Sequence, residues 1–311
     1  MRKVWPWLQM LIGVGILGVL VWKLGTRSFV DSLELISTTH IIAALALGLG
    51  TTVACAWRWC LVARSLGLNL TLSQAVSDYY RALFLNSVLP AGVLGDVHRA
   101  WKHGRKEGDI ARGVKAVVLE RTAGQIVLIA AGVAVLAATP TLVPPSVQDI
   151  VWVVLVVVGL LAVTLMVSRR LARRGSSLRR TLDDVRRGLF SRQSWPGVLG
   201  LSVACLVGNI TLFIVAADAT GLKANVGQLL PLALLCLLAM GLPINIGGWG
   251  PREGVAALAF GAAGLGAAQG LTTAVVYGVL AMVAGLPGAG VLLVQAPVLR
   301  KWGKRYAASG T

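Results

Sequence analysis

Long apolar runs alternate along the chain with short basic segments, and six of these runs are long enough to be transmembrane helices. A helix needs about 20 apolar residues to cross the hydrocarbon core of a bilayer. The six predicted spans are residues 4–23, 40–62, 111–138, 149–168, 195–217 and 270–296. The first run is too long for a signal peptide and no cleavage site follows it, so we expect a retained helix.

Two further apolar segments, residues 73–103 and 227–266, are each interrupted by helix-breaking residues. The two breaks share one pattern, in which Leu-Pro is followed after four residues by Gly and after three more by Arg. The pattern comprises Pro90, Gly95 and Arg99 in the first break, and Pro243, Gly248 and Arg252 in the second. An arm of about 15 residues rises roughly 22 Å as a helix, which passes the midplane of a bilayer without crossing it. We therefore predict two re-entrant hairpins.

The charges of the loops predict how these segments are oriented. The loop 169–194 and the tail after residue 299 are strongly basic, whereas residues 139–148 and 260–270 carry no charge. The positive-inside rule then places both termini and the basic loop 169–194 in the cytoplasm. Arg58 and Arg64 flank the first broken segment and place both of its ends on that side, whereas the second segment enters from the opposite side.

The resulting prediction is an all-α polytopic membrane protein built as an inverted repeat. It comprises one integral membrane domain, 1–311, with inverted halves at about 1–140 and 147–298, in the inner or plasma membrane of the cell. Many secondary transporters have this architecture.

The composition agrees with a membrane location. Hydrophobic residues make up 56% of the chain and charged residues 13%, against roughly 25% in a soluble protein. The net charge of +17 favours an anionic membrane surface as partner over nucleic acid, because no aromatic residues interleave with the basic runs. The four cysteines form no Cys-x-x-Cys pair and His98 and His103 are five apart, so neither a metal site nor a cofactor is expected.

The breaks are candidates for a binding site. Non-helical backbone at membrane depth is tolerated only where protein or water satisfies it, and helix N-termini concentrate positive potential. The glycines allow a tight turn and close backbone approach, and Pro251 suits a first helical turn. Arg99 and Arg252 would then attract an anion such as a phosphate. Alternatively, Arg252 pairs with Glu253 or Asp218 and Arg99 with Asp96, and the pairs only cap the hairpin tips.

The sequence also suggests roles for several other polar residues. Glu120 and Arg121, about ten residues into the span that starts at 111, are either site residues or an interfacial pair. Asp78 and Arg81, together with Asn86 and Ser87, make the first hairpin arm amphipathic enough to line a wet cavity. For Asn209 and Tyr277 the favoured role is a hydrogen bond between helices.

Three stretches, LFLNSVLPAGVLGDVHRAW, VLERTAGQ and LPINIGGWGPREG, resemble the lysylphosphatidylglycerol synthase transmembrane family, also called flippase-like domain proteins. The resemblance covers about 40–296 and implies a lipid-translocating membrane domain. Family members commonly have Asp-Arg where this chain has Glu120-Arg121, and often an Arg where Gly278 follows Tyr277. The resemblance carries over Asn86, Pro90, Gly95, Asp96, Arg99, Arg121, Gly248, Arg252 and Glu253.

Together these arguments predict a flippase-like transporter for a lipid with an anionic or zwitterionic phosphate-containing headgroup: a phospholipid, an aminoacyl-phospholipid or a polyprenyl-phosphate-linked lipid. No aminoacyl-transfer domain and no catalytic cluster is seen, so we expect no enzyme activity. The alternatives are a membrane enzyme, or an accessory subunit that holds a glycosyltransferase or lipid-modifying enzyme in polyprenyl-phosphate or glycolipid assembly. The predicted substrate-binding set is Asn86, Pro90, Gly95, Asp96, Arg99, Glu120, Arg121, Gly247, Gly248, Arg252, Glu253 and Tyr277.

Overall fold

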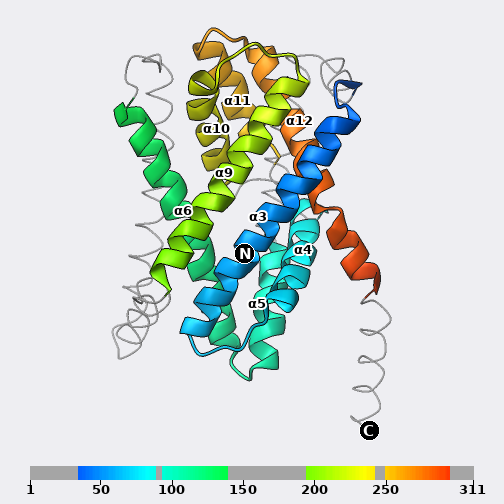
Figure 1. The fold of residues 1–311 in the computed structure, drawn as a ribbon, viewed down its shortest axis with the longest axis vertical. Coiled ribbons are helices and arrows are strands. Elements are labelled where there is room, and N and C mark those ends of the chain that lie inside the picture. The colour runs from blue at the N-terminus through cyan, green and yellow to red at the C-terminus, as the bar shows by residue number, and fades with distance from the viewer. Residues whose placement is uncertain (1–33, 89–92, 139–193, 242–248, 295–311) are drawn as a thin grey trace, which may run out of the picture.

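Every element in the described part of the chain is a helix (Figure 1). The structure, a computed structural model, describes residues 34–88, 93–138, 194–241 and 249–294. The helices in chain order are α3 (Thr38–Ser65), α4 (Leu72–Val88), α5 (Leu94–Lys106), α6 (Ile110–Ala138), α9 (Trp195–Ala219), α10 (Val226–Met240), α11 (Pro251–Ala262) and α12 (Ala267–Gly285).

Four helical segments are long and apolar enough to cross a membrane: Thr38–Ser65, Ile110–Val135, Trp195–Ala219 and Ala267–Val294. They confirm four of the predicted spans. The last segment contains α12, a turn at Leu286 and a further helical stretch that ends at Val294. The other two predicted spans, 4–23 and 149–168, lie outside the described residues.

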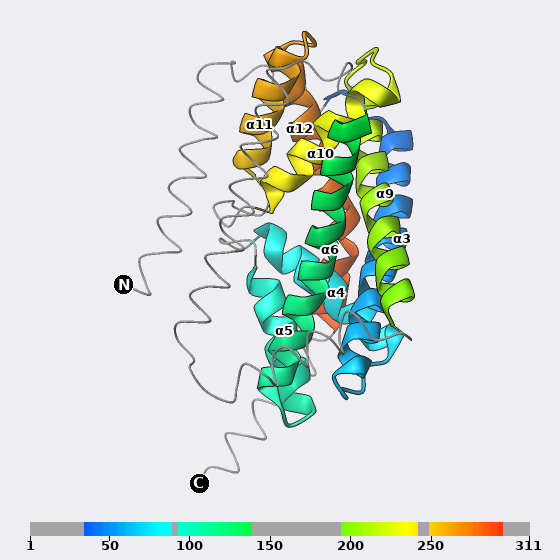
Figure 2. The same ribbon diagram turned by 90° about the vertical axis from the view of Figure 1, so that its left-hand side faces the viewer.

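The two predicted breaks separate two pairs of short helices. α4 and α5 have 17 and 13 residues, and α10 and α11 have 15 and 12, so each rises only about 18–26 Å. The helices pack within each pair. Figure 2 shows α4 and α5 in the lower half of the molecule and α10 and α11 in the upper half. The prediction that helices end on both sides of each break is therefore confirmed.

The described residues form two main hydrophobic cores, one at each end of the molecule. One core comes from α9 to α12, with Phe213, Leu235 and Phe260 at its centre. The other comes mainly from α3 to α6, around Trp59 and Val117. The long helices α3 and α9 pack side by side and connect the two regions (Figure 1).

Small residues let the long helices approach closely. A methyl group at Gly48 of α3 would overlap Ala284 of α12, and one at Gly208 of α9 would overlap Thr51 of α3. Membrane helices associate through such small residues, because lipid provides no hydrophobic drive for their association. At Gly270 of α12 a methyl group would likewise meet the backbone of α11.

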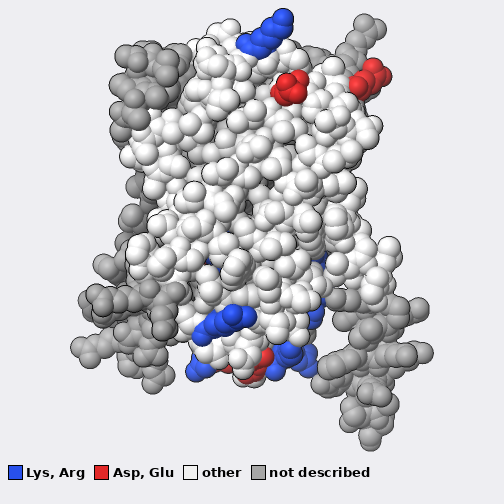
Figure 3. Space-filling model, viewed as in Figure 1, with Lys and Arg blue, Asp and Glu red and all other residues white. Residues whose placement is uncertain are grey.

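The charged residues on the surface shown in Figure 3 lie toward the ends of the molecule. Figure 3 shows an uncharged band across the middle of one face, with the basic residues gathered below it. Ten of the twelve Lys and Arg residues in the described segments lie between Arg58 and Arg121 in the sequence.

Candidate functional site

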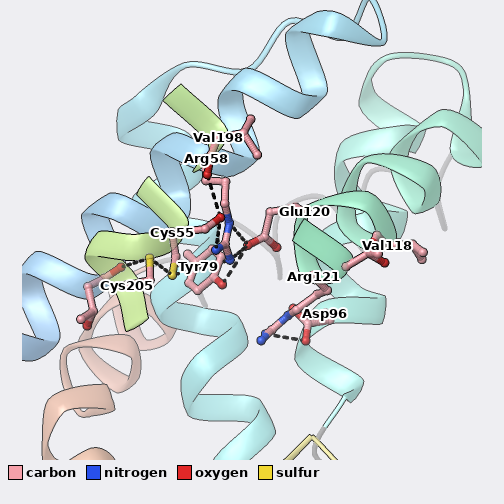
Figure 4. Close-up of polar contacts among 12 residues, drawn as sticks. Cys55, Arg58, Tyr79, Asp96, Val118, Glu120, Arg121, Val198 and Cys205 are labelled. Atoms are coloured by element: carbon pink, nitrogen blue, oxygen red, sulfur yellow. Dashed lines mark hydrogen bonds and ion pairs between the residues drawn. The ribbon is translucent and has the colours of Figure 1, made fainter. Parts of the chain in front are cut away.

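A fully buried carboxylate, that of Glu120 on α6, is the centre of a charge network between α3, α4, α5 and α6. Its side chain is 0% exposed. Glu120 Oε1 accepts hydrogen bonds from Arg58 Nε at 3.0 Å and from Tyr79 Oη at 3.4 Å, and Oε2 accepts one from Arg99 Nη2 at 2.8 Å. Figure 4 shows Arg58 and Tyr79 converging on Glu120. One carboxylate thus fixes three side chains from three other helices.

Asp96, in the first turn of α5, extends the network toward the surface of the protein. Its carboxylate accepts hydrogen bonds from Arg99 Nε at 2.8 Å, from Arg121 Nη2 at 2.7 Å and from Asn86 Nδ2 at 3.1 Å. The Asn86 oxygen accepts the backbone N–H of Gly95 at 2.7 Å, which caps the start of α5. Figure 4 shows Arg121 reaching from α6 to Asp96.

Gly95 brings α5 against α4. A methyl group at this position would overlap the backbone of Ala82, with its Cα at 2.6 Å. Close backbone approach, which the sequence predicted for this glycine, is therefore confirmed. The contact places Asp96 within reach of Asn86, so the packing of the helix pair determines the geometry of the network.

The network carries more positive than negative charge. It contains three guanidinium groups, of Arg58, Arg99 and Arg121, and two carboxylates, so its formal charge is +1. Arg99 is buried between the rings of Trp59 and Tyr79, at 4.6 and 4.5 Å from their centroids. Its Nη1 has no acceptor among the described residues, whereas the side chain of Arg121 is 44% exposed. An anion that reached this network through Arg121 would neutralise its excess charge.

A second buried pair, Arg252 and Glu253, lies at the start of α11. Gly250 has a φ of +106°, a conformation that other residues rarely adopt, and Pro251 is the first helical residue, as predicted. Glu253 Oε2 accepts the N–H of Gly250 at 2.7 Å, and its Oε1 accepts Arg252 Nε at 2.9 Å. The carboxylate therefore caps the helix N-terminus that the sequence predicted as an anion site.

The aromatic residues around Arg252 hold its guanidinium in place. It stacks on the rings of Trp249 and Tyr277, at 5.0 and 5.2 Å from their centroids. A methyl group at Gly278 of α12 would overlap Arg252 Nη2 and the ring of Trp249, so a larger residue there would shift both side chains. Tyr277 Oη donates to Asn209 Oδ1 at 3.3 Å, which confirms the predicted hydrogen bond between helices.

The sequence profile of the lysylphosphatidylglycerol synthase transmembrane region matches residues 7–288 of this chain. This protein belongs to the lysylphosphatidylglycerol synthase transmembrane-region family. The match confirms the resemblance, and together with the four apolar helices it shows a membrane protein related to lipids. A search of curated proteins finds no match to the chain.

In this member of the lysylphosphatidylglycerol synthase transmembrane-region family, the predicted site residues fall into two groups. Asn86, Gly95, Asp96, Arg99, Glu120 and Arg121 lie together in the first network, and Arg252, Glu253 and Tyr277 lie together at α11. Pro90, Gly247 and Gly248 lie outside the described residues. Both predicted ion pairs, Arg99–Asp96 and Arg252–Glu253, are formed, whereas Asp218 lies beside His40.

Two interpretations of the sequence are wrong. Arg58 is not a cytoplasmic flanking charge, because it is buried and bound to Glu120. Glu120 is not part of an exposed interfacial pair, because Arg58 and Arg99 enclose it. Tyr79 and Trp59 were missed. The available signal was the position of Arg58 inside an apolar span, since ionisable residues within membrane helices face the protein interior and mark functional sites.

Proposed function

We propose that this protein is a flippase-like transporter that moves a lipid with an anionic or zwitterionic phosphate headgroup between the two leaflets. The observation that carries the proposal is the buried network around Glu120, with its formal charge of +1 and the partly exposed side chain of Arg121. Glu120 lies ten residues into α6, about 15 Å along the helix axis. Ionisable groups at this depth are costly and are retained for function.

The arrangement of the short helices supports a transporter architecture. Two pairs in opposite halves of the molecule (Figure 2) fit re-entrant hairpins in an inverted repeat, the architecture in which broken helices form substrate sites near the bilayer midplane. A buried arginine follows each break, Arg99 on α5 and Arg252 on α11. We place the basic lower end of Figure 3 and both termini in the cytoplasm, with the protein in the cell membrane.

The network around Glu120 and the Arg252–Glu253 pair would act at different steps of transport. The Arg252–Glu253 pair is neutral and closed by Trp249 and Tyr277, so a headgroup has to separate the pair before it binds there. The network around Glu120 has excess positive charge, and the side chain of Arg121 within it is 44% exposed. It therefore receives the headgroup first, and the second pair accepts it when the hairpins move relative to one another.

The experiment is a translocation assay in vesicles that contain the purified protein. The vesicles carry fluorescent phosphatidylglycerol, and a membrane-impermeant reductant bleaches only label in the outer leaflet. The wild-type protein should expose label from the inner leaflet, and protein-free vesicles should not. Translocation of each labelled lipid is measured with and without a proton gradient and a membrane potential.

Arg121→Ala is the informative variant, because Arg121 is exposed and its loss leaves Glu120 paired. Loss of one charge-assisted contact, about 1.5–3 kcal/mol, should lower transport at subsaturating lipid roughly ten- to a hundred-fold. Arg112→Ala is the matched control: Arg112 is on the same helix, its side chain is 55% exposed, and it pairs with Asp109 at 3.1 Å. Its transport should equal that of the wild type.

The proposal is overturned if the wild type moves none of three lipids: phosphatidylglycerol, lysylphosphatidylglycerol and a polyprenyl phosphate. Chemical conversion of any of these lipids in the same vesicles would instead establish the enzyme alternative. If a lipid is moved but Arg121→Ala and Arg112→Ala both match the wild type, the network does not bind the headgroup.

A further inference from the structure

We infer that the outer face formed by α5 and α6 is the docking site through which an anionic phosphodiester lipid enters from the bilayer. Arg121 binds the phosphate and the acyl chains lie along apolar side chains of both helices. This inference rests on the proposed function and deepens it, since it names the entry site and the charge class of the lipid.

Exposed apolar residues follow one face of α6. Val114, Val118, Ile126 and Val133 are all at least 38% exposed. Their spacing of four, eight and seven residues keeps them within one sector of a helix. Arg121 comes three residues after Val118, so its backbone lies at the edge of this apolar stripe. Its side chain is 44% exposed, and its guanidinium turns toward Asp96 and the ring of Tyr79.

α5 continues the apolar surface on the other side of Arg121. Leu94, Val97 and Trp101 are exposed and lie at positions i, i+3 and i+7, which form one stripe on a helix. α5 and α6 pack together, and the bond from Arg121 to Asp96, in the first turn of α5, brings the guanidinium close to the start of the α5 stripe. A partly exposed cation thus lies beside apolar surface of two helices, which matches an amphiphile with an anionic head.

The charges specify which amphiphile fits. A phosphodiester with one net negative charge brings the network from +1 to zero, whereas a zwitterionic lipid leaves the charge at +1. The planar guanidinium of Arg121 suits two phosphate oxygens at once. The Asp96 carboxylate holds that guanidinium, so a phosphate that binds Arg121 replaces Asp96 there, and Asp96 keeps Arg99 and Asn86 as partners.

Photo-crosslinking tests this docking site. A photoreactive benzoylphenylalanine replaces Val97 or Val118 in the full chain, in vesicles of phosphatidylcholine with a minor fraction of phosphatidylglycerol. The control position is Leu199 on α9, an apolar residue whose exposed fraction lies between those of Val97 and Val118. Mass spectrometry then gives the lipid composition of the adducts at each position.

The two α5–α6 positions should capture phosphatidylglycerol several-fold above its fraction in the vesicle, and position 199 should capture lipids in the bulk ratio. Arg121→Ala should abolish the enrichment, and Arg112→Ala should leave it unchanged. The docking site is wrong if all three positions give the bulk ratio. It is also wrong if positions 97 and 118 crosslink to protein, which would show that another part of the chain or a second copy covers the face.

Failure of the docking site and failure of the proposed function give different results. If phosphatidylglycerol is transported normally while positions 97 and 118 show no enrichment, the lipid enters elsewhere and the transporter proposal stands. If enrichment depends on Arg121 but no lipid crosses the bilayer, the docking site stands and the transporter proposal is wrong.

Discussion

Replacement of Glu120 by Gln is the sharpest test of the buried network in the unliganded protein. The substitution keeps the size of the side chain and one acceptor oxygen, but it removes the negative charge between Arg58 and Arg99. The formal charge of the network rises from +1 to +2. Because removal of one partner of a buried ion pair leaves the other charge uncompensated, the free energy of unfolding should fall by about 3–5 kcal/mol.

The matched control is Glu107→Gln. Glu107 is solvent-accessible and accepts the backbone N–H of Asn69 at 3.3 Å, a contact that a glutamine oxygen retains. The free energy of unfolding of Glu107→Gln should stay within about 0.5 kcal/mol of the wild-type value. The measurement is equilibrium unfolding of each purified variant in mixed micelles, followed by intrinsic fluorescence.

A double variant, Arg58→Met with Glu120→Gln, separates charge balance from lost packing. It restores the formal charge of +1, so it should be more stable than the sum of the two single effects by about 0.5–3 kcal/mol. Two results would show that charge does not stabilise the network as a unit. One is an equal loss of unfolding free energy in Glu120→Gln and Glu107→Gln. The other is strictly additive effects of Arg58→Met and Glu120→Gln.

Two further substitutions test the second pair and the helix packing. Arg252→Met should destabilise the protein by about 3–5 kcal/mol because Glu253 remains charged and buried, and adding Glu253→Gln should recover part of the loss in the same unfolding assay. Gly95→Ala should reduce the yield of folded protein in size-exclusion chromatography, because its methyl group meets the backbone of α4. Gly50→Ala, at a helical glycine with open space around it, should be neutral or stabilising by up to about 1 kcal/mol; a normal yield for Gly95→Ala would contradict the close contact of α4 and α5.

The sequence was sufficient to predict the helices and their breaks. The apolar run from 111 to 138 predicts α6 almost to the residue, because a membrane helix satisfies its own backbone and needs no distant partner. The short-range ion pairs could also be predicted, because Asp96 and Arg99 are three residues apart and Arg252 and Glu253 are adjacent. Both pairs form.

The long-range ion pair between Arg58 and Glu120 could not be predicted from a single sequence. Arg58 and Glu120 are 62 residues apart, and nothing in either local pattern specifies that their helices bring them together. Arg58 lies seven residues before the end of α3, close enough to the basic flank of that helix to be interpreted as part of it. The role of Gly278 likewise depends on a contact with Arg252 of another helix.

The most direct test of the headgroup site is an experimental structure of the protein in lipid nanodiscs that contain phosphatidylglycerol. We predict a lipid phosphate within hydrogen-bond distance of the Arg121 guanidinium, with Asp96 no longer bound to Arg121 but still bound to Arg99. The acyl chains should lie against Val97 and Val118. Ordered phosphatidylglycerol bound elsewhere, with the Arg121–Asp96 bond at its present 2.7 Å, would contradict the claim that the network receives the headgroup.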